Sequence, residues 1–188
     1  METKKQKLSA EGRKVFLQFC GAELTYGMVW GTLSFITLFL SGAGMNSEQV
    51  GIVMSITSVF AMISAPVWGV IADKVGSRRK IFLLLMVVSG VGFAVLPLSA
   101  GVKILGLSLV SLLLPAFTFF RQPGSSMMDA MVVGATTHFP GMSYSAIRLW
   151  NSVGYMIIAP LYSIGVAKFG IALPFYGFCV FSLSLIHI

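Results

Sequence analysis

Four ionisable residues lie inside long apolar runs of this sequence, where charged side chains are rare. They are two acids, Glu23 and Asp129, and two bases, Arg121 and Arg148. A charge at the centre of a bilayer costs about 2.5–3.5 kcal/mol on insertion scales, so such residues ordinarily serve a function. A carboxylate beside an arginine can be switched between its protonated and ionised forms by solute or water. These residues indicate solute binding coupled to proton transfer, and the alternative is two ion pairs that only hold helices together.

Helical geometry predicts how the four side chains pair. Asp129 lies near the inner end of one expected helix and Arg148 near the inner start of the next, so the two can form an ion pair. Glu23 lies roughly 12 Å and Arg121 roughly 18 Å from the same side, at about 1.5 Å of rise per residue. The side chains of Glu23 and Arg121 are long enough to bridge this difference in depth and to contact each other. Arg121 and Asp129 differ by eight residues, about 80° around a helix, so one face can present both to a shared cavity.

Apolar runs of membrane-spanning length must position these charges. A helix needs about 20 apolar residues to cross the bilayer core. Six runs meet or approach this length: Val15–Leu40, Val50–Ile71, Ile81–Leu98, Leu105–Val133, Ala146–Val166 and Ile171–Ile188. The connections between them are short, which predicts antiparallel neighbours with no inserted domain.

Small residues and one proline shape these expected helices. Gly27 and Gly31 form a G-x-x-x-G step in the first run, and such steps allow helices to approach closely within a membrane. In the fourth run, Pro123 and Gly124 follow Arg121 and Gln122. A proline removes a backbone hydrogen bond, so we expect a kink there. Broken helices near the midplane are typical of transporter binding sites, although proline kinks are also common in membrane helices.

The composition excludes most other classes of protein. Of 188 residues, 56% are hydrophobic and only 10% are charged, against about 25% charged in soluble domains. Continuous apolar runs favour helices over the alternating strands of a membrane barrel. The two cysteines, Cys20 and Cys179, lie in apolar stretches and exclude a disulfide framework. His138 and His187 have no neighbouring acid, cysteine or metal-ligand cluster, so we expect neither an enzyme nor a cofactor.

The positive charge lies mainly on one side of the expected helices. The net charge is +7, and nine basic residues fall on the side of the N-terminus: Lys4, Lys5, Lys7, Arg13, Lys14, Lys74, Arg78, Arg79 and Lys80. Only Lys103 and Lys168 fall on the other. Basic loops stay cytoplasmic, which predicts a cell-membrane protein with a cytoplasmic N-terminus, residues 1–14, and a bundle over residues 15–188. The bilayer, including anionic lipid, is the expected partner of these charges, and nucleic acid is not.

The loop after the second run carries a recognisable motif. Residues 69–80 read Gly-Val-Ile-Ala-Asp-Lys-Val-Gly-Ser-Arg-Arg-Lys. This resembles the signature loop of the major facilitator superfamily, although Ser77 stands where a basic residue often follows the glycine. The resemblance implies a conformational latch against the other half of such a transporter. Its residues would be Gly69, Asp73, Lys74, Gly76, Arg78 and Arg79; the alternative is a plain basic loop.

The start of the fifth run carries a second resemblance. Residues 148–155 read Arg-Leu-Trp-Asn-Ser-Val-Gly-Tyr, which is similar to the branch of oligosaccharide:proton and nucleoside:proton symporters. Asn151 departs from the glycine usual there. In the lactose-permease-like members, an acid late in span four and an arginine early in span five bind the sugar, and Asp129 and Arg148 fit those places. Trp150 could stack on a ring or pack between helices.

These resemblances imply an all-helical, polytopic membrane fold: the N-terminal six-helix half of a twelve-span transporter. The expected function is proton-coupled symport of a small polar solute such as a sugar or nucleoside. The alternatives are a drug:proton antiporter, whose glycine pair is missing between Gly154 and Gly165, and a non-transporting membrane protein. The last run reaches Ile188 without a charged flank, and residues 184–188 resemble translated sequencing adapter. We therefore expect a truncated chain whose partner is the missing C-terminal half.

Overall fold

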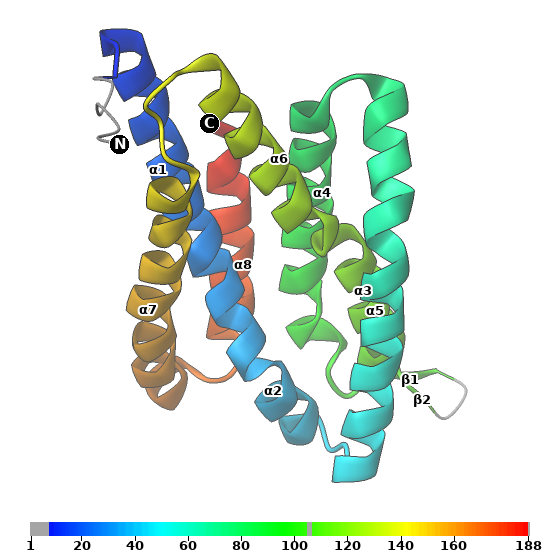
Figure 1. Cartoon of the computed structure of the whole chain (residues 1–188). Coiled ribbons are helices and arrows are strands. Elements are labelled where there is room, and N and C mark those ends of the chain that lie inside the picture. Colours follow the sequence, from blue (N-terminus) through cyan, green and yellow to red (C-terminus); the bar gives the residue numbers. More distant parts are fainter. Residues whose placement is uncertain (1–7, 105–106, 188) are drawn as a thin grey trace.

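The computed structural model describes residues 8–104 and 107–187, and these form a bundle of helices that run up and down (Figure 1). The elements in chain order are α1 (Ala10–Gly31), η1 (Thr32–Phe35), α2 (Ile36–Gly42), α3 (Ser47–Val75), α4 (Arg78–Val95), η2 (Pro97–Ser99), β1 (Lys103–Ile104), β2 (Leu107–Ser108), α5 (Leu109–Arg121), α6 (Pro123–His138), α7 (Tyr144–Phe169), α8 (Leu173–Ser184) and η3 (Leu185–His187). The expected helical membrane fold is confirmed.

Within the described part of the chain, four helical segments are long and apolar enough to cross a membrane: Ala10–Gly42, Ser47–Val75, Arg78–Ser99 and Tyr144–Phe169. The remaining passages, α5–α6 and α8–η3, are interrupted or shorter. They continue the alternation of direction, so the start of α1 and the end of the chain lie at the same end of the bundle (Figure 1). This is the arrangement of a multi-pass membrane protein.

Capping residues explain where several helices begin and end. Ser9 accepts a hydrogen bond from the Gly12 backbone N–H at 3.0 Å, so α1 begins at Ala10, five residues before the expected apolar run. Asn46 and Gln49 form a reciprocal capping box at the start of α3. Gly76 ends α3 in the left-handed conformation, with φ +68°, which a residue with a Cβ rarely adopts. Short sequence signals therefore set the helix ends.

Two membrane passages are broken. The fourth divides into α5 and α6 at Gln122, immediately before Pro123, as the proline predicts. The first also changes, from α-helix to a 3₁₀ turn over Thr32–Phe35. No proline marks that second break, and the sequence pattern did not indicate it. The expected loop after η2 also differs, since it forms a small antiparallel hairpin of β1 and β2.

The helices pack in pairs that are distant in sequence. Helix α1 lies against α7, and α4 lies against α8. Phe93 of α4 stacks on Phe178 of α8, with ring centroids 4.2 Å apart. Buried residues make up 44% and 50% of the most apolar stretches of the first and third membrane-length segments, but only 22% and 17% of those in α3 and α7. Among these four segments, α3 and α7 therefore carry the more open apolar faces.

Candidate functional site

A single arginine lies between two carboxylates where α1, α6 and α7 meet. Arg148 of α7 donates from Nη1 to Glu23 Oε2 of α1 at 3.0 Å. Its Nε lies 3.4 Å from Asp129 Oδ1 of α6. The Glu23 side chain is fully buried, whereas the side chains of Arg148 and Asp129 are each 34% exposed. The arginine thus links a fully buried acid to one that is partly exposed.

Two glycines bring α1 and α7 close enough to form this contact. A Cβ placed on Gly27 of α1 would collide with the backbone carbonyl oxygen of Asn151 on α7. A Cβ on Gly154 of α7 would likewise collide with the Leu24 carbonyl of α1. The two backbones therefore touch, as small residues permit in membrane helices. This close crossing places Glu23 opposite Arg148.

Two further polar residues of α7 surround the charges. The Tyr144 hydroxyl donates to Asp129 Oδ1 at 3.0 Å. The side-chain amide of Asn151 lies near the Glu23 carboxylate, although its Nδ2 makes no hydrogen bond of standard geometry to a described residue. Neither was singled out as a site residue from the sequence. Tyr144, Arg148 and Asn151 follow one another by four and three residues, so they share one face of α7, and that spacing is a usable signal.

The charges of this cluster do not balance. With both acids ionised, Glu23 and Asp129 carry two negative charges against the one positive charge of Arg148. A buried charge is costly unless it is paired. The cluster therefore reaches neutrality when one acid holds a proton or when a cationic group binds beside them.

Arg121 does not join this cluster, contrary to the expected Glu23–Arg121 contact. It lies at the end of α5, only 8% exposed, and its guanidinium carbon is 5.1 Å from the Trp30 ring centroid. Its Nη2 donates to Gln122 Oε1 at 3.0 Å. The depth argument misjudged the pairing because helix rotation and the α1–α7 crossing, and not depth alone, decide which side chains meet. Glu23 therefore pairs with Arg148.

Trp150 lies on a different side of α7. It follows Arg148 by two residues, about 200° around the helix, and is 40% exposed. This geometry does not bring it to the charge cluster. The expected stacking role is therefore not one that it could perform beside Glu23 and Asp129 in this arrangement.

Comparison with known proteins decides the family. The model of the MFS_1 like family matches residues 24–187, which is most of the chain. The chain belongs to the major facilitator superfamily. Asp129 and Arg148 of the charge cluster, the broken fourth passage and the α3–α4 loop lie within the matched segment, and Glu23 lies one residue before it.

Curated superfamily members similar to this chain have differing names. The nitrate/nitrite transporter NrtP of a Picosynechococcus species is 29% identical over 157 residues, covering 81% of this chain and 29% of the relative. The multidrug resistance protein MdtG of Yersinia enterocolitica is 36% identical over 77 residues, covering 38% of this chain and 18% of the relative. The efflux pump PmrA of Streptococcus pneumoniae is 29% identical over 83 residues, covering 41% of this chain and 21% of the relative. The chain thus matches under a third of the length of each of these relatives.

The superfamily loop between α3 and α4 is a tight, exposed turn. Asp73 Oδ1 lies 3.6 Å from Arg78 Nη2, with side chains 70% and 55% exposed. Gly76 supplies the left-handed residue of the turn, and the Ser77 hydroxyl accepts from the Lys80 backbone N–H at the start of α4. A Cβ on Gly69 would meet no atom within 4 Å. The loop therefore offers its acid and its bases at the surface of one end of the bundle.

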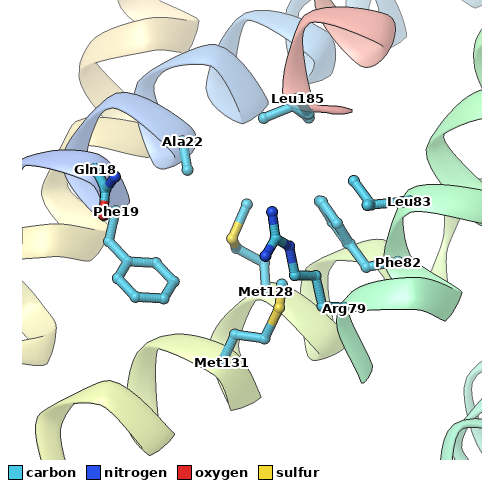
Figure 2. Close-up of a pocket in the computed structure, with 9 residues that line it drawn as sticks. All are labelled: Gln18, Phe19, Ala22, Arg79, Phe82, Leu83, Met128, Met131 and Leu185. Carbon is cyan, nitrogen blue, oxygen red and sulfur yellow. The ribbon is translucent and has the colours of Figure 1, made fainter. Parts of the chain in front are cut away.

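A cavity of about 170 Å³ lies beside the charge cluster without including it. Its walls are mostly apolar, and the Arg79 side chain points toward its centre (Figure 2). Ala22 and Met128, the chain neighbours of Glu23 and Asp129, line it. Glu23 and Asp129 themselves are not among the residues that line it. The charge cluster is therefore the candidate site, and the cavity is a separate feature beside it.

Proposed function

We propose that this chain provides the N-terminal half of a proton-coupled solute transporter. One observation carries the proposal: Arg148 is shared by a buried and a solvent-accessible carboxylate inside an apolar bundle. Membership of the superfamily supports the transport class. The curated relatives support transport as well, although their names differ, since one is a nitrate/nitrite transporter and two are multidrug resistance or efflux proteins. The solute is proposed to be small and polar, such as a sugar or nucleoside.

In the proposed mechanism, Asp129 exchanges the proton. Its side chain is 34% exposed whereas that of Glu23 is fully buried, so protons from water reach Asp129 first. Protonation removes the negative charge beside Arg148 Nε, and the arginine then keeps only its bond to Glu23. The freed guanidinium donors can bind an acceptor group of the solute. Loss of the proton restores the Asp129–Arg148 ion pair and displaces the solute.

Reconstituted protein tests the proposal. Proteoliposomes that contain the complete transporter and a pH-sensitive dye report proton movement when a solute gradient is imposed. We expect Asp129→Asn and Arg148→Ala to abolish solute-driven proton flux. Glu48→Gln is the matched control, because Glu48 is an exposed acid in the first turn of α3. Normal coupled flux in Asp129→Asn and Arg148→Ala would remove the site assignment.

Drug:proton antiport is the second candidate function. The similarity to the multidrug resistance protein MdtG and the efflux pump PmrA favours it, and the excess of acid in the cluster is compatible with a cationic substrate. Expression of the complete transporter should then raise resistance to lipophilic cations such as ethidium. Unchanged resistance together with solute-driven proton uptake would support symport over antiport.

We further propose that the basic end of the bundle is cytoplasmic and that the α3–α4 loop is the latch against the second half. The end of α3 and the start of α4, which carry Lys74, Arg78 and Lys80, lie at the same end of the bundle as the start of α1 (Figure 1). The positive-inside rule places this end in the cytoplasm. The exposed Asp73–Arg78 pair leaves both side chains accessible to a partner. The proposed partner is the C-terminal half of the same transporter.

A further inference from the structure

Arg121 is a buried positive charge that has no negative partner among residues 8–104 and 107–187. It is 8% exposed, and the salt bridges among the described residues do not include it. Arg148 shows the contrast, since it contacts two carboxylates. Burying a charge without a counter-charge is costly. An unpaired arginine in the middle of an apolar bundle is therefore expected to bind a ligand.

The neighbours of Arg121 leave its charge uncompensated. Trp30 offers a ring face at 5.1 Å, and Gln122 offers a neutral amide oxygen at 3.0 Å. Both are uncharged. The Nε donor of Arg121 is buried and has no acceptor within the described part of the chain. One positive charge and at least one unused hydrogen-bond donor thus remain.

A second unused donor lies beside it. Tyr26 of α1 is 1% exposed, and its ring centroid lies 6.3 Å from that of Trp30, the ring that Arg121 faces. Its hydroxyl lies near Trp30 but makes no hydrogen bond of standard geometry to a described residue. A Cβ on Gly124 would come within 3.0 Å of that hydroxyl, so the glycine after the helix break makes room for it. Tyrosine and arginine donors therefore converge at the α5–α6 break.

We propose that Arg121 and Tyr26 bind a carboxylate carried by the transported solute. This inference rests on the proposed transport function and narrows the solute from any small polar molecule to one with a singly charged oxyanion, such as a sugar acid. Two donors and one net positive charge match a carboxylate, which accepts hydrogen bonds and neutralises the arginine. A neutral hydroxyl would satisfy a donor but leave the charge. Arg121 ends α5 and Asp129 lies in α6, beyond the break at Gln122, so the proposed anion site and the proposed proton site belong to the same membrane passage.

The purified 188-residue chain in lipid nanodiscs provides the first test. Trp68→Phe and Trp150→Phe leave Trp30, beside Arg121, as the single fluorescent reporter. The probes are sodium acetate and its uncharged analogue acetamide, with the sodium concentration held constant by sodium fluoride. We expect saturable change of Trp30 emission with acetate and none with acetamide.

Variants of the chain assign the effect. Arg121→Gln should abolish acetate binding, Arg121→Lys should retain part of it, and Tyr26→Phe should weaken it about tenfold, because a hydrogen bond to a charged group is lost. Arg13→Gln is the matched control, since Arg13 is an exposed arginine of α1. Circular dichroism checks that each variant is folded. If Arg121→Gln does not fold, Arg121→Lys and Tyr26→Phe still decide between ligand binding and a purely structural role.

Three results would overturn the inference. The first is no saturable response to acetate, and the second is an equal response to acetamide. The third is acetate binding to the isolated chain that disappears in the complete transporter, which would assign the site to an acidic side chain of the second half. Failure of the proposed function gives a different pattern: acetate binding persists, but solute-driven proton flux is absent or does not depend on Asp129.

Discussion

Gly27 of α1 lies against the backbone carbonyl of Asn151 on α7, with no space for a Cβ between them. This contact fixes the distance between the two helices that carry Glu23 and Arg148. The chemistry of the charge cluster therefore depends on a residue that has no side chain. The crossing is also a place where a single methyl group should have a measurable effect.

Gly27→Ala is expected to destabilise the bundle by about 1–3 kcal/mol, because the added Cβ overpacks a backbone contact. Gly21→Ala is the matched control on the same helix, since a Cβ there would meet no atom within 4 Å. It should be neutral or stabilising by up to about 1 kcal/mol. Unfolding in mixed micelles of increasing SDS content measures both. Equal stability of the two variants would show that the crossing is looser than described.

Glu23 and Arg148 should be energetically coupled. Arg148→Gln leaves Glu23 buried without its ion-pair partner, which costs about 3–5 kcal/mol for a fully buried pair. Because the Arg148 side chain is 34% exposed, we expect about 1–3 kcal/mol here. Glu23→Gln in the same chain should recover most of this loss, because it removes the unpaired charge. A double-mutant cycle on the same unfolding assay measures the coupling, and additive effects would contradict the ion pair.

Asp73→Asn should lower transport with little effect on stability. The Asp73–Arg78 pair is 3.6 Å long and largely exposed, so its loss should change stability by less than about 1 kcal/mol. If the loop is a latch, uptake by the complete transporter should nevertheless fall strongly. Paired measurements of unfolding and of initial uptake rate check this prediction. Glu11→Gln, which alters an exposed acid at the same end of the bundle, should affect neither. Unchanged uptake in Asp73→Asn would show that the loop is not a latch and acts only as a basic segment that sets the orientation of the bundle.

Single cysteines should report the orientation of the bundle. In a Cys20→Ala, Cys179→Ala background, Lys80→Cys lies at the basic end and Lys168→Cys at the opposite end. Both lysines are exposed. A membrane-impermeant maleimide applied to intact cells should label Lys168→Cys and leave Lys80→Cys unlabelled until the membrane is opened. The reverse pattern would place the N-terminus outside.

The amino-acid sequence was sufficient for the class of fold and for one feature of the site. Long apolar runs, few charges and basic residues gathered on one side require a helical membrane protein, because the bilayer tolerates little else. Pro123 predicted the break in the fourth passage, since a proline cannot supply its backbone N–H. Asp129 and Arg148 could be placed together because consecutive antiparallel helices bring residues of equal depth side by side. All of these inferences use only local order along the chain.

The tertiary structure alone decided the partner of Glu23 and the isolation of Arg121. Helices α1 and α7 are far apart in sequence, and their contact depends on which helices become neighbours and how each is rotated about its axis. A rotation of 100° moves the site by one residue, and hydropathy does not define it in helices that are apolar nearly all round. Two backbones touching at Gly27 and Gly154 settle that rotation. As a result Arg148 pairs with Glu23, whereas Arg121 contacts the ring of Trp30 and the side-chain amide of Gln122.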